Sequence, residues 1–95
     1  MRVIVKEPGV PAKWRWVDND LKALQEAVGG YIETVTITSD AVLILDEEGR
    51  LKGKEYNMTL LGVDIVGTFL VVGKKEDEFT DCPLPAMRVL FGVSA

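Results

Sequence analysis

Residues 64–73, with the sequence DIVGTFLVVG, predict the central strand around which the fold is built. The run from Phe69 to Val72 is continuously apolar, which is typical of a strand buried inside a sheet. Gly67, just before this run, indicates a bulge or a close approach of another backbone segment. We therefore expect this segment to form the last of the central strands of the sheet.

Two upstream segments predict further strands. Residues 41–51, AVLILDEEGRL, are typical of an apolar strand, a type I turn with Gly49 at positive φ, and a short partner strand. Residues 31–39, YIETVTITS, alternate in polarity, so that Ile32 shares one face with three threonines and Val35 lies on the other face. Both segments favour strands of a mostly antiparallel sheet.

The N-terminal residues predict a hairpin. Residues 2–5, RVIV, form its first strand, Pro8-Gly9 forms its turn, and residues 12–17, AKWRWV, form the returning strand. Side chains alternate along a strand, so Trp14 and Trp16 share one face. The opposite face carries Lys13, Arg15 and Val17.

The sequence predicts one regular helix and two shorter helical segments. Residues 20–28, DLKALQEAV, have apolar side chains at helical spacing, with Asp18 or Asn19 as the expected cap and Gly29 as the terminator. The shorter segments are residues 57–61, NMTLL, capped by Asn57, and residues 83–91, PLPAMRVLF, capped by Asp81.

These elements predict a single domain over residues 1–95 in the α+β class. We expect a mostly antiparallel sheet of about five to six strands, with one helix packed on a face and a short C-terminal helix.

Composition predicts a soluble, intracellular protein. The chain has 95 residues, 47% of them hydrophobic, and a net charge of −4, which disfavours non-specific binding to nucleic acid duplexes. Cys82 is the only cysteine, which favours a reducing compartment. The N-terminus lacks the apolar stretch of a signal peptide, and no apolar run has the length of a membrane span.

The sequence lacks the residues on which most enzyme mechanisms depend. The chain has no histidine, so it has no imidazole base and no histidine metal ligand. It also has no Walker loop, and the acidic runs 46–48 and 76–78 are turns in which three neighbouring carboxylates do not converge on an ion. We therefore predict no catalytic residue, no metal and no cofactor.

The two tryptophans form the first candidate binding surface. Trp14 and Trp16 either pack under the helix or face outward beside Lys13 or Arg15, where they would stack on a planar ring or anchor a partner. The apolar strands already supply most of a core for one helix, which favours the outward arrangement.

The second candidate surface is basic. Arg50, Lys52 and Lys54 alternate along the predicted partner strand, so they would project to one side and either bind an anion or discourage edge-to-edge pairing of sheets. Asn57 either caps a helix or donates a hydrogen bond to a ligand.

Three stretches carry a resemblance to a known family: EPG, LQEAVGGYIE, and LDEEGRLKG followed by Asn57 and DIVGTFLVVG. In this order they resemble family 3846 of the domains of unknown function, from about residue 2 to residue 73. The resemblance implies a phage-type or mobile-element accessory protein in the cytoplasm of a bacterial host and assigns no chemistry. The chain departs from the family pattern at Asp46, where asparagine is usual, and at residues 58–59, where arginine and alanine are usual.

The leading functional hypothesis is a non-catalytic accessory protein that sequesters a small anionic, ring-containing molecule of the signalling-nucleotide class, as in counter-defence. Its predicted ligand-binding residues are Trp14, Arg15, Trp16, Arg50, Lys52, Lys54 and Asn57. A chain this small forms a deep pocket more easily between subunits, which favours a homo-oligomer. The alternative is a protein-interaction module or an inhibitor that docks on a host protein, with the tryptophans as anchors.

Overall fold

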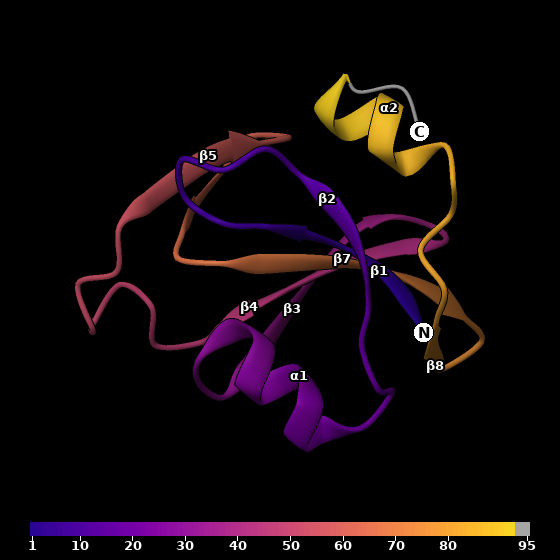
Figure 1. Cartoon of the computed structure of the whole chain (residues 1–95), viewed down its shortest axis with the longest axis horizontal. Coiled ribbons are helices and arrows are strands. Elements are labelled where there is room, and N and C mark those ends of the chain that lie inside the picture. The colour runs from indigo at the N-terminus through magenta and orange to yellow at the C-terminus, as the bar shows by residue number, and fades with distance from the viewer. Residues whose placement is uncertain (93–95) are drawn as a thin grey trace.

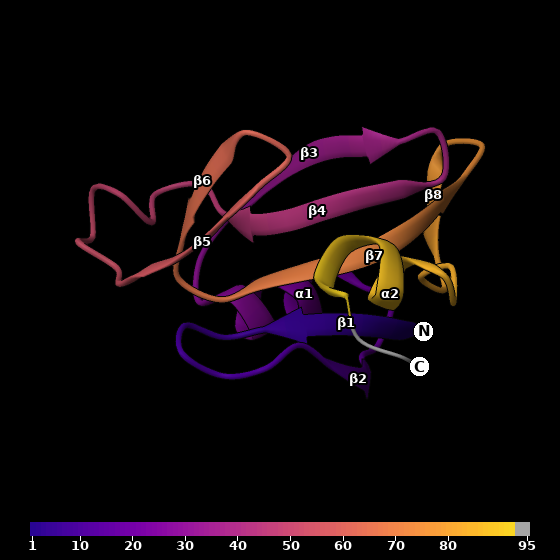
Figure 2. The same cartoon turned by 90° about the horizontal axis from the view of Figure 1, so that it is seen from above.

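The fold was analysed in a computed structural model, which describes residues 1–92. The α+β prediction is confirmed: a six-stranded antiparallel sheet has the strand order β2-β1-β7-β4-β3, and β8 pairs with the end of β7 (Figures 1 and 2). The strands are β1 (Arg2–Lys6), β2 (Lys13–Trp16), β3 (Ile32–Thr38), β4 (Ala41–Asp46), β7 (Phe69–Lys75) and β8 (Glu78–Thr80).

The central strand predicted over residues 64–73 is confirmed only for residues 69–73, which lie in β7, because residues 64–66 belong to β6 (Val63–Val66) of a second sheet. β7 lies between β1 and β4, and its residues Phe69 to Val72 are fully buried. Leu70 and Val72 face one side of the sheet and Phe69 and Val71 face the other, so the strand contributes to two separate apolar cores. A continuous apolar run is needed because both faces of this strand are covered.

The first core lies under helix α1 (Leu21–Val28), on one face of the sheet. Leu24 and Val28 lie there in one apolar cluster with residues of the strands that α1 covers, among them Ile44 of β4 and Val72 of β7. The expected cap was wrong by one or two positions: Asp20, directly before the first helical residue, accepts a 2.8 Å hydrogen bond from the Ala23 amide. Gly29 ends the helix at φ 80°, as predicted.

The second core lies on the opposite face of the sheet. It is covered by helix α2 (Ala86–Phe91) and by a separate two-stranded sheet of β5 (Tyr56–Leu60) and β6 (Val63–Val66). Figure 1 shows α1 and α2 on opposite sides of the six-stranded sheet.

Four local predictions in this half of the chain were wrong. Residues 57–61 form most of β5 instead of helical turns, because Met58 and Leu60 pack on the second core while Thr59 is exposed, which is the period of a strand. Pro85 caps α2 without a side-chain hydrogen bond, and the carboxylate of Asp81 instead accepts from the Arg2 amide at 2.7 Å.

The predicted partner strand after β4 is also absent. Residues 47–53 form consecutive turns, and residues 54–55 lead from them into β5. Gly49 lies outside the positive-φ region and is buried against Val66, so its small size serves packing instead of turn conformation. Within residues 1–92, no helix is long and apolar enough to cross a membrane.

Candidate functional site

The predicted basic surface does not exist as three free cations, because two of the lysines are bound to one carboxylate. Lys52 Nζ lies 2.9 Å and Lys54 Nζ 2.6 Å from Asp46 Oδ2. The same ammonium groups donate to the last carbonyls of α1: Lys54 to Val28 at 2.8 Å, and Lys52 to Gly29 at 3.2 Å. The cations therefore fix the loop of residues 47–55 against the negative end of the helix dipole.

Asp46 is the only buried charged residue in the described part of the chain, 4% exposed. Burial by itself raises the pKa of this carboxyl group. Hydrogen bonds from Lys54, Lys52 and the Glu48 amide outweigh that effect and lower the pKa from 3.8 to about 2. Asp46 is therefore ionised at neutral pH and neutralised by its two lysines.

Two of the three motifs that carry the family resemblance meet at this cluster. A Cβ atom at Gly30 would lie 2.6 Å from both Asp46 Oδ1 and Lys52 Nζ, and one at Gly67 would lie 2.8 Å from Lys54 Cδ. Both glycines are needed because charged side chains occupy the space of a side chain. The second and third motifs thus meet in one ion-pair cluster of buried Asp46 with Lys52 and Lys54, which we call the Asp46 cluster.

Asn57 and Arg50 also bind other parts of the fold. Asn57 Nδ2 donates to the carbonyls of Lys6 at 2.9 Å and Gly67 at 2.8 Å, and its Oδ1 accepts from Lys6 Nζ at 3.0 Å. The helix-capping role predicted for Asn57 was wrong, because the residue joins β5 to β1 and to the start of β7. Arg50 donates to the Asp64 carbonyl of β6 at 2.9 Å.

The two tryptophans lie on the face of the sheet opposite α1, so packing under that helix is excluded. Trp14 is half-buried against the second core, and the Arg2 guanidinium carbon lies 5.4 Å from its ring centroid. Trp16 is 74% exposed. Of the two rings, only that of Trp16 is open to a partner over most of its surface.

Arg2 belongs to the same surface as the two tryptophans, and the sequence alone did not identify it as a site residue. Besides contacting Trp14, its guanidinium donates to the Cys82 carbonyl at 3.0 Å. The one available signal was the hairpin register, which places Arg2 opposite Trp16 and on the same face.

The backbone of β2 is free along its outer edge. β2 is the outermost strand, and it pairs only with β1 (Figure 2). Met1 and Val17 exchange both backbone hydrogen bonds, at 2.7 and 2.9 Å, in register with the pair Arg15–Val3. Bonded pairs alternate in an antiparallel ladder, so the amides and carbonyls of Trp14 and Trp16 point outward.

The α1-side face of β2 is basic. Arg15 is exposed and makes no ion pair with any of residues 1–92, and Lys13 has only an exposed 3.5 Å contact with Glu7. Arg15 and the Asp46 cluster lie on the α1 face, whereas the tryptophans lie on the α2 face. The seven predicted ligand-binding residues are therefore not brought together into one site.

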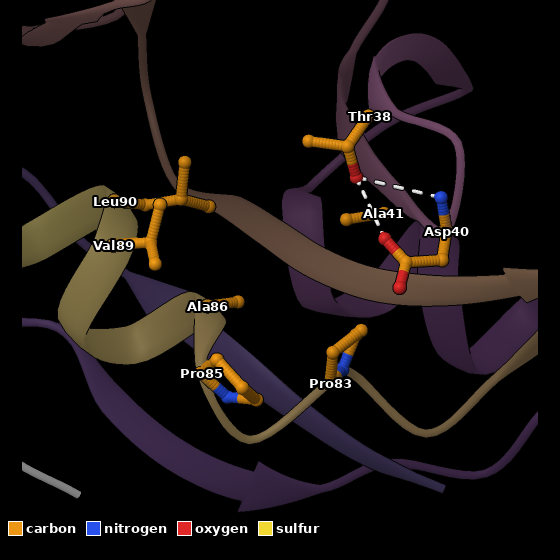
Figure 3. A pocket seen from close by; sticks show the side chains of 8 residues that line it. All are labelled: Thr38, Asp40, Ala41, Pro83, Pro85, Ala86, Val89 and Leu90. Atoms are coloured by element: carbon orange, nitrogen blue, oxygen red, sulfur yellow. Dashed lines mark hydrogen bonds between the residues drawn. The ribbon is translucent and has the colours of Figure 1, made fainter.

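A pocket of about 160 Å³ lies between α2 and the turn that joins β3 to β4 (Figure 3). Its wall is mostly apolar, with Val89 and Leu90 on the helix side. Thr38 donates from Oγ1 to Asp40 Oδ1 at 2.8 Å on the other side. The pocket contains none of the seven predicted binding residues.

Cys82 is fully buried beside this region. Burial raises the pKa of its thiol from 9.0 to about 12, so the thiolate needed for nucleophilic chemistry does not form at neutral pH. Among residues 1–92, no group of acidic or cysteine side chains is arranged to hold a metal ion.

The fold and the site define a small α+β protein with a buried ion-pair cluster and one open, tryptophan-bearing edge strand. The chain belongs to the family described as Domain of unknown function (DUF3846), whose profile matches residues 1–90. No curated protein and no solved structure matches the chain.

Proposed function

We propose that this protein is a non-catalytic interaction module that binds an extended segment of another protein along the outer edge of β2. The proposal is supported chiefly by one coincidence: the residues whose backbone groups point outward, Trp14 and Trp16, are also those that carry the tryptophan rings. An added strand would gain hydrogen bonds and an aromatic contact at the same positions.

The unprotected state of this edge also favours a docking role. Exposed edges are usually blunted by proline, by charges directed inward or by a covering loop. β2 has none of these within Lys13–Trp16, and its edge is protected only by its length of four residues and by the cations on one of its faces.

Capture of a small anionic ring, expected from the sequence, stays a prediction, as do a homo-oligomer and a phage-type counter-defence role. Lys52 and Lys54 share the carboxylate of Asp46 and donate to the carbonyls at the end of α1, and Arg15 lies on the sheet face away from the tryptophan rings. Docking of a protein segment is the function that the geometry supports better.

The Trp16 position provides the test of the proposed function. Trp16→Ala removes the ring, and Trp16→Pro also removes the outward amide without breaking a bond to β1, so both variants should fold. A random peptide library selected on the wild type, with counter-selection on Trp16→Pro, should enrich peptides that protect the Trp14 and Trp16 amides from hydrogen exchange. We expect Trp16→Ala to weaken their binding by about 30-fold, a loss of about 2 kcal/mol.

Leu51→Ala is the matched control, because Leu51 is 87% exposed and lies in the loop after β4. This variant should bind the selected peptides like the wild type. Failure to enrich any peptide, or protection confined to the pocket beside α2, would contradict docking at β2.

A further inference from the structure

We infer that the segment bound by β2 alternates acidic and apolar residues, with its acidic side chains on the α1 side of the sheet and its apolar side chains on the α2 side. This inference rests on the proposed function and adds the chemistry of the partner to it. It follows from the register of β2 and from the charges on its two faces.

The ladder geometry determines which partner residue meets which side chain. On the outer edge, Trp14 and Trp16 would form the hydrogen-bonded pairs with an antiparallel segment, and Arg15 would sit at the non-bonded position between them. Cα atoms are closest at non-bonded positions, about 4.5 Å apart. The residue opposite Arg15 therefore has the most intimate side-chain contact and the greatest influence on selectivity.

The positive charges of Arg15 and Lys13 on the α1 side favour an acidic partner residue opposite Arg15. Arg15 has no ion-pair partner among the described residues, and Lys13, two residues away on the same face, has only its exposed contact with Glu7. Opposite charges directly across a ladder stabilise pairing, and like charges oppose it. The whole chain carries a net charge of −4, so general attraction would favour a basic peptide, and a preference for acids must come from these two residues.

The same charges argue against a second copy of this chain as the occupant. Antiparallel self-pairing that uses both tryptophans of each copy places Trp14 opposite Trp16 and therefore Arg15 opposite Arg15. Two guanidinium groups would then meet at the closest position of the ladder. An acidic segment removes this repulsion.

Apolar residues are selected on the α2 side. The exposed ring of Trp16 continues the apolar surface that half-buried Trp14 forms on the second core. A β-branched or aromatic residue opposite each tryptophan would cover that surface.

Defined peptides test the inference. The probes are two capped seven-residue peptides, one alternating valine with glutamate and one alternating valine with lysine, and both are titrated into ¹⁵N-labelled protein. We expect the glutamate peptide to bind about tenfold more tightly and to protect the Trp14 and Trp16 amides. Arg15→Glu should reverse the preference, and Lys22→Glu, an exposed change on α1, should leave it unaltered.

The possible results distinguish an error in the partner's chemistry from an error in the proposed docking function. Equal binding of both peptides, with protection at β2, would overturn the acidic preference and leave the docking function intact. Binding of neither probe, when library-selected peptides do bind, would likewise overturn the inference alone. A concentration-dependent rise in native mass that Trp16→Pro abolishes would identify a second copy as the occupant and overturn the inference.

Discussion

Replacing Asp46 with asparagine should lower the free energy of unfolding by about 2–3 kcal/mol at pH 7. Removing one partner of a buried ion pair usually costs about 3–5 kcal/mol, because the remaining charge is left unpaired. The expected loss is smaller here, since the side chains of Lys52 and Lys54 are 41% and 23% exposed and can turn towards water. Urea unfolding of both proteins measures the difference.

The matched control for this prediction is Glu47→Gln. Glu47 is the exposed neighbour of Asp46, and its side chain makes no ion pair among residues 1–92. Its substitution should change stability by no more than about 0.5 kcal/mol. Equal effects of the two substitutions would show that the Asp46 cluster does not stabilise the fold.

The contribution of Asp46 should also depend on pH. Its pKa is about 2 in the folded chain against an ordinary value of 3.8, so the unfolded chain takes up the proton first as pH falls. The stabilisation is fully present above about pH 4 and is lost as pH falls through the folded value near 2. The stability difference between the wild type and Asp46→Asn should therefore shrink between pH 5 and pH 2. A constant difference would assign the effect to packing.

The Asp46 cluster shows why part of the fold could not be predicted from the sequence. Alternation of Arg50, Lys52 and Lys54 is a local pattern, and a local pattern favours a strand. The carboxylate that draws the two lysines inward belongs to the end of β4, and the carbonyls that they also bind belong to α1. Tertiary ion pairing of this kind overrides the pattern.

Other elements were predictable because their signals are local. The apolar run in β7, the alternation in β3 and the Pro8-Gly9 turn each depend on a few adjacent residues. The shared face of Trp14 and Trp16 followed from the period of a strand. Whether those rings are covered depends on strand order, because β2 lies at the margin of the sheet, and order between distant strands leaves no local signal.

Replacing Gly73 with alanine should have the largest effect on stability, a loss of at least about 3 kcal/mol. Gly73 lies in β7 opposite Thr80 of β8. A Cβ atom there would overlap the carbonyl oxygen of Asp81 and would lie 3.0 Å from its carbonyl carbon. The obstacle is backbone, so no side-chain rotation relieves it.

Displacement of Asp81 would also disturb β1 and the second core. The Asp81 carboxylate accepts from the Arg2 amide at 2.7 Å, and the Cys82 amide donates to the Arg2 carbonyl at 2.8 Å. Moving this segment breaks both bonds and disturbs buried Cys82. Thermal unfolding should show a melting temperature lower by at least about 12 °C, since about 1 kcal/mol corresponds to about 4–8 °C in a domain of this size.

Gly53→Ala separates this steric effect from the general cost of replacing a glycine. Gly53 has φ 68° with open space around the position of a Cβ atom, so its substitution strains the backbone without a collision. That strain should cost only about 1–2 kcal/mol. Gly73→Ala should therefore be the more destabilising of the two, although Gly73 does not have the positive φ that usually marks an irreplaceable glycine. The opposite ranking would mean that the segment after β8 does not lie against β7.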